Sequence, residues 1–149
     1  MIEQGLVVRR AVEGDARRIS WAKDSRYCRS AFHNILCSDI SASVREPDSW
    51  VVFVAEEYGK IIGVASAYCD SRAAVLHRLL VHPDYRGKGL NDLLVKARVD
   101  HARDVWHSQN VFVTFYDREK GVKRYSEFGF KPVDDRNYDA VLRLRDKHV

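Results

Sequence analysis

The residues best suited to bind a ligand lie in Arg86-Gly87-Lys88-Gly89-Leu90-Asn91, just after an apolar run that ends at Val81. The two glycines let the backbone approach a ligand without interference from a Cβ atom. A helix that begins directly after them offers unpaired N–H donors and the positive end of its dipole. Arg86 and Lys88 add positive charge at the same place. This strand–loop–helix pattern therefore favours an anion as ligand, most naturally a phosphate.

The spacing within this loop excludes two common phosphate-binding motifs. No Gly-Lys-Ser/Thr closes a longer glycine frame, as a Walker loop requires, and the dinucleotide fingerprint needs three glycines at other spacings. The order Arg86-x-x-Gly89-x-Asn91 instead resembles the acyl-CoA pyrophosphate loop of the GNAT superfamily of N-acyltransferases. That pattern is Arg or Gln, two residues, Gly, one residue, then Gly or Ala, so Asn91 departs from it. The alternative interpretation is an ordinary glycine-rich turn before a surface helix.

A second local match is Tyr125-Ser126-Glu127-Phe128-Gly129-Phe130, which resembles the family's Tyr-x-x-x-Gly-Phe. The resemblance implies that Tyr125 donates a proton to the leaving thiolate, which a phenol with a pKa of about 10 can do. The alternative is a tyrosine that packs on the core side of an amphipathic helix. We favour Tyr125 as the catalytic acid.

The candidate base is His77. Many family members carry a Glu on the strand before the phosphate loop, where this chain has Val75, which cannot accept a proton. His77 follows two residues later, on the same strand face, and the string from Leu76 to His82 is similar to that of aralkylamine-type members. An imidazole with a pKa near 6.5 suits proton abstraction, directly or through water. A half-buried structural histidine is an equal alternative.

The resemblance also implies which residues hold the cosubstrate, acetyl-CoA. The main chain of Leu79 to Val81 would bind the pantetheine arm and polarise the thioester carbonyl. Arg118 stands where many relatives have an Asn that binds this arm; its longer, charged side chain could instead reach the phosphates or stay in solvent. Asp117 is interpreted as a helix N-cap. The predicted cofactor-binding residues are Leu79, Leu80, Val81, Arg86, Gly87, Lys88, Gly89, Leu90, Asn91 and Arg118.

Length and composition limit the classes of protein to which this chain can belong. The 149 residues predict a single domain, 1–149, and the 46% apolar and 31% charged residues are typical of a soluble globular protein. No apolar run approaches the ~20 residues of a membrane helix, and Met1 to Gly5 lacks the layout of a signal peptide. Three cysteines without a Cys-x-x-Cys pair favour reduced thiols, a cytoplasmic location and no metal. The net charge of +4 permits an anionic partner, and a CoA-sized polyphosphate would satisfy it as well as nucleic acid would, so composition does not decide the partner. The charges form no long basic block, and nucleic acid is not the expected partner.

Hydrophobic periodicity and turn residues predict the order β-α-α-β-β-β-α-β-α-β-β. This is the order of the GNAT fold, a mixed α/β (α+β) architecture with a central six- to seven-stranded mixed sheet and about four helices. His82, His101, His107 and His148 are expected on loops or solvated helix faces. The predicted strands are Leu6–Ala11, Trp50–Ala55, Ile61–Tyr68, Ala73–Val81, Val111–Tyr116, Phe130–Val133 and Tyr138–Leu144; helices follow Gly14 and Ser25 and span Leu90–Asp104 and Arg118–Phe128, with Ser38–Ser49 irregular.

These expectations combine into an N-acetyltransferase that moves an acetyl group from acetyl-CoA to a primary amine by direct attack. The absent Glu and the strand histidine favour a small amine as acceptor. Protein amines and aminoacyl-tRNA stay open as acceptors, and a non-catalytic acyl-CoA-binding or regulatory module stays open as a different function. A homodimer is compatible with the family resemblance.

Overall fold

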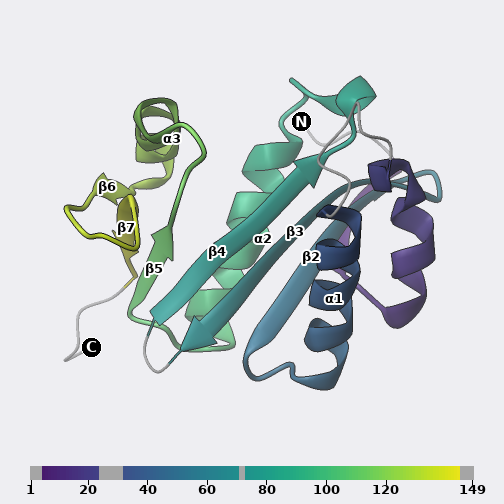
Figure 1. The fold of residues 1–149 in the computed structure, drawn as a ribbon, viewed down its shortest axis with the longest axis horizontal. Coiled ribbons are helices and arrows are strands. Elements are labelled where there is room, and N and C mark those ends of the chain that lie inside the picture. The colour runs from purple at the N-terminus through teal and green to yellow at the C-terminus, as the bar shows by residue number, and fades with distance from the viewer. Residues whose placement is uncertain (1–4, 24–31, 71–72, 145–149) are drawn as a thin grey trace.

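The protein is built around one seven-stranded sheet (Figure 1). The computed structural model describes residues 5–23, 32–70 and 73–144. The strand order is β1-β2-β3-β4-β5-β7-β6, and among the described strands only β4 and β5 pair in parallel. The predicted mixed α/β fold and order of elements are confirmed. The elements are β1 (Leu6–Arg10), the 3₁₀ segment η1 (Glu13–Lys23), α1 (Phe32–Arg45), β2 (Trp50–Glu57), β3 (Lys60–Asp70), β4 (Ala73–Val81), η2 (Pro83–Tyr85), α2 (Leu90–Asp104), β5 (Asn110–Val113), α3 (Arg118–Tyr125), η3 (Ser126–Phe128), β6 (Lys131–Pro132) and β7 (Ala140–Arg143).

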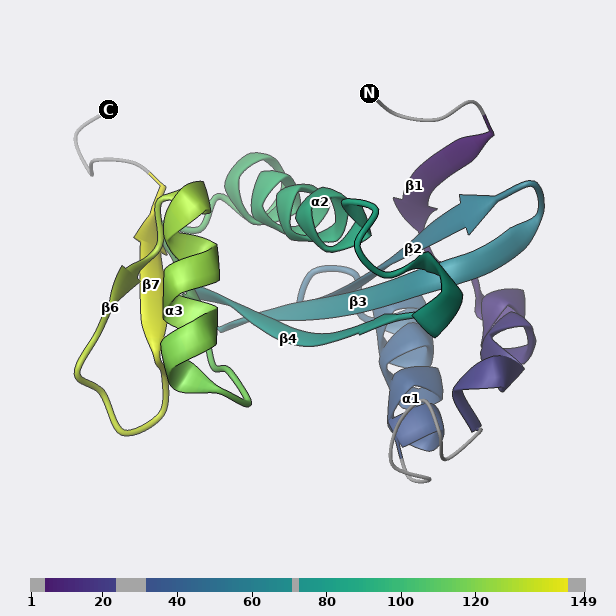
Figure 2. The same ribbon diagram turned by 90° about the horizontal axis from the view of Figure 1, so that it is seen from above.

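Helices cover both faces of the sheet. α2 lies on one face, and α1 with η1 lies on the other (Figure 2). Leu36 of α1 packs in a cluster with Val52 of β2, whereas Leu94 of α2 packs with Ala55 of the same strand. Because strand side chains alternate between faces, the central strands are apolar on both sides. Within the described ranges, no helix is both long and apolar enough to cross a bilayer.

The predicted hairpin between β2 and β3 is confirmed, with a two-residue loop. Glu57 pairs with Lys60, which leaves Tyr58 and Gly59 as the turn. Both have positive φ, 49° and 81°, as a type I′ turn requires. The glycine at the tight position therefore determines where β2 ends and β3 begins.

The prediction that Ser38–Ser49 is irregular is wrong for the first part of this segment, because α1 continues to Arg45. The polar residues that suggested a loop lie one helical turn apart and face the sheet: Asp39 is 5% exposed and Ser43 is 2% exposed. The Ser43 hydroxyl accepts a hydrogen bond of 3.0 Å from the Val52 N–H. Polarity here marks buried hydrogen bonds rather than solvent exposure.

Two other predicted boundaries differ from the structure. β5 ends at Val113 rather than at Tyr116, because the Phe115 N–H donates to the Asp139 carboxylate at 2.8 Å instead of to a neighbouring strand. The first helical segment, η1, is a 3₁₀ helix with a kink at Ile19. The predicted start of the second helix after Ser25 lies outside the described residues.

β4 carries a β-bulge at His77. Its pairing with β3 matches Leu76 to Ala67 and Arg78 to Ser66, so His77 is the extra residue. The parallel pairing of β4 with β5 ends at Leu76, and the two strands diverge beyond that point (Figure 1). The backbone of β4 after the bulge therefore lacks a β5 partner, which opens the sheet at this point.

Candidate active site

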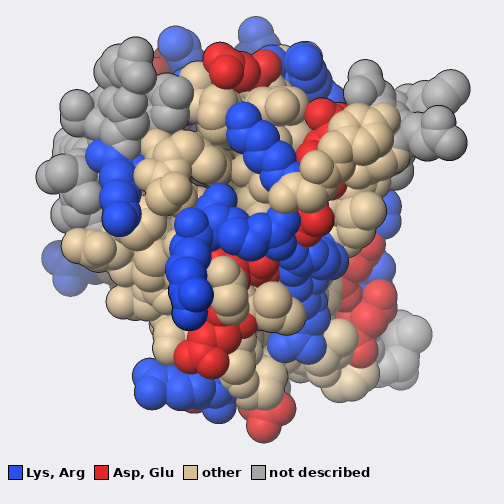
Figure 3. All heavy atoms as spheres, turned by 90° about the vertical axis from the view of Figure 1, so that its right-hand side faces the viewer, with Lys and Arg blue, Asp and Glu red and all other residues tan. Residues whose placement is uncertain are grey.

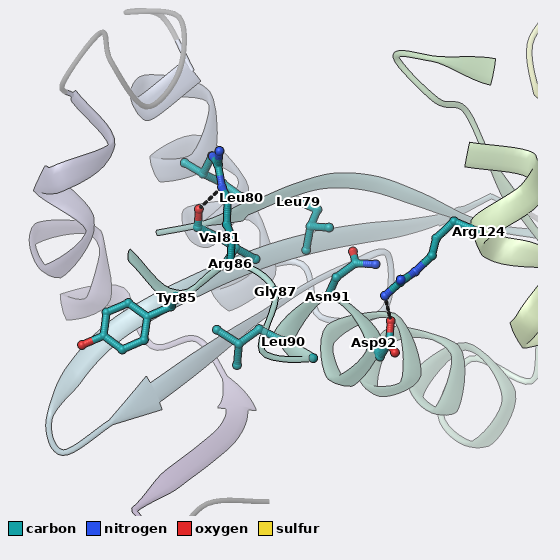
Figure 4. Close-up of a pocket in the computed structure, with 11 residues that line it drawn as sticks. Leu79, Leu80, Val81, Tyr85, Arg86, Gly87, Leu90, Asn91, Asp92 and Arg124 are labelled. Atoms are coloured by element: carbon teal, nitrogen blue, oxygen red, sulfur yellow. Dashed lines mark hydrogen bonds and ion pairs between the residues drawn. The ribbon is translucent and has the colours of Figure 1, made fainter. Parts of the chain in front are cut away.

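The predicted phosphate loop borders a cavity of about 700 Å³ (Figure 4). Gly87 and Gly89 adopt φ angles of 79° and 84°, which glycine reaches without steric cost. A Cβ atom at either position would meet nothing within 4 Å, so the loop is open there. No side chain caps α2 at Gly89, which leaves its first N–H groups available to an anion. The cavity is lined by Leu79, Leu80, Val81, Tyr85, Arg86, Gly87, Gly89, Leu90, Asn91, Asp92 and Arg124.

Basic side chains from the loop itself and from the start of β3 lie around this loop. Arg86 Nε donates to the Val81 carbonyl at 3.2 Å, which ties the loop to the end of β4 (Figure 4). The Nζ atoms of Lys88 and Lys60 lie 5.3 Å and 5.6 Å from the centre of the Tyr85 ring. Lys60 was not predicted, because it comes from the start of β3 and only the fold brings it to the loop.

Arg124 reaches from α3 to this cavity and pairs with Asp92 on the first turn of α2 (Figure 4). The sequence analysis did not identify either residue. Their ion pair links the two helices that carry the predicted pyrophosphate loop and the predicted acid.

A smaller cavity of about 300 Å³ lies where β4 and β5 diverge. It brings together the predicted acid Tyr125, the predicted base His77 and Leu79 of the predicted cofactor strand. Leu79 lines both cavities, so the two are adjacent. The full lining is Phe32, Leu76, His77, Arg78, Leu79, Arg98, Val113, Thr114, Phe115, Tyr116 and Tyr125.

Tyr125, at the end of α3, both packs against the core and lines a cavity, so it agrees with each of the two interpretations given above. Its side chain packs edge-on against the rings of Phe115, Phe128 and Phe130, with centroid distances of 4.8, 5.9 and 5.5 Å. It is 8% exposed and still lines the cavity. Gly129, with φ of 94°, ends the helical segment as predicted. The aromatic packing fixes the orientation of a phenol whose position beside the cavity suits proton donation.

His77 lies on the α1 face of the sheet, next to Trp50 and Tyr68. The ring centroids are 5.9 Å and 5.2 Å away, both edge-on. Burial lowers the pKa of His77, the neighbouring Arg78 lowers it further, and Asp39 opposes the shift. The imidazole is therefore neutral near pH 7, the form that can accept a proton.

Arg118 and Asp117 lie at the start of α3. The Asp117 carboxylate accepts from the Lys120 N–H at 3.2 Å, which confirms it as the N-cap. Arg118 donates to the Val133 carbonyl at 3.1 Å and pairs with Asp139 at 3.2 Å. Neither of the two cavities described above is lined by Arg118, so the structure does not bring it together with the other predicted cofactor residues.

The sequence analysis missed two buried polar groups that meet at Ser66. On the α1 face, Asp39 pairs with Arg78 at 2.8 Å and accepts from the Ser66 hydroxyl at 3.0 Å. On the α2 face, Arg98 donates to the Ser66 carbonyl at 3.1 Å. Arg98 follows Leu90 and Leu94 at four-residue spacing, which places it on the apolar face of the helix. The spacing does not show that its guanidinium bonds to the carbonyl of Ser66 on β3, because that contact joins distant segments.

Two histidines expected in solvent are buried. His101 is 6% exposed on α2, between the rings of Phe53 and Trp106. Burial lowers the pKa of His101 to about 4. His82, before η2, is 4% exposed and its Nδ1 accepts from the Asp84 N–H at 3.2 Å. His82 lies on a loop as expected, whereas the solvated face expected for His101 is wrong, because Phe53 of the distant strand β2 packs against it.

The face at the β2–β3 hairpin end of the sheet mixes charges of both signs, with basic side chains in a central band and acidic ones beside them (Figure 3). Arg9 pairs with Asp15 at 2.8 Å and with Glu56 at 2.7 Å, and Arg18 pairs with both carboxylates. These pairs lower the pKa of Glu56. This face is therefore not the uniform basic surface that a nucleic acid backbone would favour.

Comparisons with known proteins identify relatives of the chain. The model of the acetyltransferase (GNAT) family matches residues 11–130. The chain is 41% identical over 58 residues to the L-amino acid N-acyltransferase MnaT of Escherichia coli, which covers 36% of this chain and 34% of that protein. It is 28% identical over 119 residues to human N-acetyltransferase 8B, covering 75% of this chain and 52% of the relative. The chain thus spans about half, or less, of the length of these relatives.

Solved structures share the fold at low identity. The PaiA N-acetyltransferase of Thermoplasma acidophilum, solved with coenzyme A, has a TM-score of 0.72 and 16% identity over 93% of this chain and 99% of that one. The dodecameric spermidine N-acetyltransferase of Vibrio cholerae has a TM-score of 0.67 and 19% identity over 95% of this chain and 92% of that one.

Proposed function

Because the chain belongs to the acetyltransferase (GNAT) family, we propose that it is an acetyl-CoA-dependent N-acetyltransferase that acts on a primary amine by direct attack. The observation that carries this proposal is the cavity at the divergence of β4 and β5, where Tyr125, His77 and Leu79 meet beside the glycine loop. An acid, a base and an exposed strand edge at one point are what acyl transfer from a thioester to an amine requires.

The open loop at Gly87 and Gly89 and the uncapped start of α2 fit the pyrophosphate of acetyl-CoA. Arg86, Lys88 and Lys60 would supply positive charge around it. The remaining predicted residues Leu90 and Asn91 begin the helix, and the main chain from Leu79 to Val81 would receive the pantetheine arm. Arg118 would not contact the cofactor directly in this arrangement, since it forms an ion pair with Asp139.

His77 would accept a proton from the ammonium of the acceptor, directly or through one water molecule. Its lowered pKa keeps it in the accepting form at neutral pH. The amine nitrogen then attacks the thioester carbonyl, and N–H groups of β4 after the bulge polarise the carbonyl oxygen. As the C–S bond breaks with its electron pair on sulfur, Tyr125 donates its proton to the sulfur.

A small amine is the acceptor class that we propose. The rings of Trp50 and Tyr68 flank His77 on the α1 face, and aromatic faces attract a cationic amine before it loses its proton. Relatives named for a free amino acid and for spermidine support the same class. Protein amines and aminoacyl-tRNA are the rival acceptors that the test below separates.

The test follows CoA release with a thiol reagent across small amines, amino acids, lysine peptides and aminoacyl-tRNA. Turnover of a small amine supports the proposal, and Tyr125→Phe should lower kcat about a hundredfold while leaving the KM for acetyl-CoA within about twofold. Binding of acetyl-CoA without turnover of any amine would indicate a binding module instead. If aminoacyl-tRNA alone is acetylated, the acceptor is aminoacyl-tRNA and the small-amine assignment is wrong.

The pH profile tests His77. The acidic limb of kcat/KM should have its midpoint below pH 6.5, because burial and Arg78 lower the pKa of His77. His77→Gln should remove this limb. An unchanged profile in that variant would exclude His77 as the base.

We also propose that residues 1–149 act as one domain, in the cytoplasm, and that copies of the chain associate. Cys37 and Cys69 are free thiols, as a reducing compartment favours. The dodecameric relative supports self-association. Light scattering of the purified protein would test it.

A further inference from the structure

Arg98 of α2 is a buried charged side chain that the proposed reaction does not use. It is 1% exposed. Its Nε donates to the Leu94 carbonyl and its Nη1 to the Ser66 carbonyl, both at 3.1 Å. The third nitrogen, Nη2, is also buried and has no hydrogen-bond partner among the described residues. Both bonds that the guanidinium makes go to neutral carbonyl groups, so its charge lacks a paired carboxylate there.

Arg98 lines the same cavity as Tyr125 and Leu79. Burial lowers the pKa of Arg98, and both the charge of Tyr125 and hydrogen bonding between the two side chains oppose that shift. A structural arginine that clamps α2 to β3 would need only the two bonds it makes. A spare donor held beside the acid instead suits negative charge that develops during the reaction.

We propose that Arg98 is a positioning residue for Tyr125, whose hydroxyl oxygen accepts a hydrogen bond from Nη2 during the transfer. The inference rests on the proposed function. The bond aims the phenol O–H at the CoA sulfur and stabilises the phenolate after the proton has moved. The C–S bond breaks with its electron pair on sulfur, and the Tyr125 proton converts that sulfur to the thiol. His77 holds the first proton of the ammonium, and the second, which the nitrogen loses after its attack, passes through solvent and restores the phenol.

The first test is a double-mutant cycle in the full chain. Arg98→Met should lower kcat about thirtyfold with the KM for acetyl-CoA within about twofold, and adding it to Tyr125→Phe should cause no further loss. Multiplicative effects in the double variant would overturn the proposal. Arg98→Lys keeps the positive charge but loses the planar guanidinium with its several N–H donors. Its kcat should lie between those of the wild type and Arg98→Met, and adding it to Tyr125→Phe should again cause no further loss. Arg103→Met is the matched control: Arg103 lies on the same helix, paired with Asp100 at 2.8 Å, and its loss should leave kcat unchanged.

The second test needs no turnover. Calorimetry at pH 9 compares CoA with desulfo-CoA, because an alkyl thiol with a pKa of about 8.5 is largely thiolate there. The wild type should bind CoA about tenfold more tightly, and the ratio should fall to about one in Arg98→Met and in Tyr125→Phe. An unchanged ratio in Arg98→Met would overturn the inference. If no amine is acetylated but the ratio behaves as expected, the proposed function fails while the role of Arg98 stands.

Discussion

The two faces of the sheet treat buried polar groups differently. On the α1 face, Asp39 and Arg78 form a closed ion pair that also includes the Ser66 hydroxyl. On the α2 face, two buried nitrogen atoms, Arg98 Nη2 and His101 Nε2, have no hydrogen-bond partner within the described residues. The first face balances its charges internally. The second retains polar atoms that no neighbour satisfies.

Burial alone therefore does not assign a role to a polar side chain. Arg98 lies at the cavity beside Tyr125, where an unpaired donor can act. His101 lies among aromatic rings, where a neutral imidazole is tolerated because its pKa is low.

The largest expected effect concerns His101 and acid stability. The pKa of His101 is lowered from 6.5 to about 4 in the folded state, so between these values the unfolded state binds a proton that the folded state does not. Stability is therefore lost as pH falls through this window, by about 3 kcal/mol at 1.36 kcal/mol per unit. Urea unfolding at pH 7 and pH 4 should show His101→Met with about 3 kcal/mol less acid loss than the wild type. Equal losses in both proteins would contradict this.

The next effect concerns the ion pair on the α1 face. Asp39→Leu should lower the free energy of unfolding by about 2 kcal/mol, less than a fully buried pair would lose, because the Arg78 side chain is 24% exposed and can reach water. Arg98→Met should cost less, about 1 kcal/mol, because the loss of its two buried hydrogen bonds to the Leu94 and Ser66 carbonyls is partly offset by removal of a buried charge. Equilibrium urea unfolding measures both. A larger loss in Arg98→Met than in Asp39→Leu would reverse the contrast between the faces.

The smallest effect concerns the start of α2. Gly89→Ala should destabilise the fold by about 1 kcal/mol, because its φ of 84° strains any L residue although its Cβ would meet open space. The same change should raise the KM for acetyl-CoA a few fold. Gly14→Ala is the matched control, since Gly14 has an ordinary φ and equally open surroundings. Equal stabilities of the two variants would show that the backbone angle is unimportant.

Local patterns predicted much of the fold. β4 and α2 have the predicted bounds, and the hairpin, the Asp117 cap and the Gly129 stop are confirmed. Each depends on residues close in sequence, such as an apolar period, a glycine or a capping carboxylate. The prediction failed at Ser38–Ser49 and at His101, where a polar residue is buried by partners from distant segments.

For the candidate site, spacing along the chain was enough to predict the glycine loop and to propose Tyr125 and His77, because a motif is a local pattern. The cavity that these side chains share follows from the fold, through the bulge at His77 and the end of the β4–β5 pairing at Leu76. Only the fold placed Arg98 there, with an Nη2 atom that makes no hydrogen bond to the residues that the structure describes. The physical reason is that burial and charge pairing arise from contacts between segments that the order of residues does not bring together.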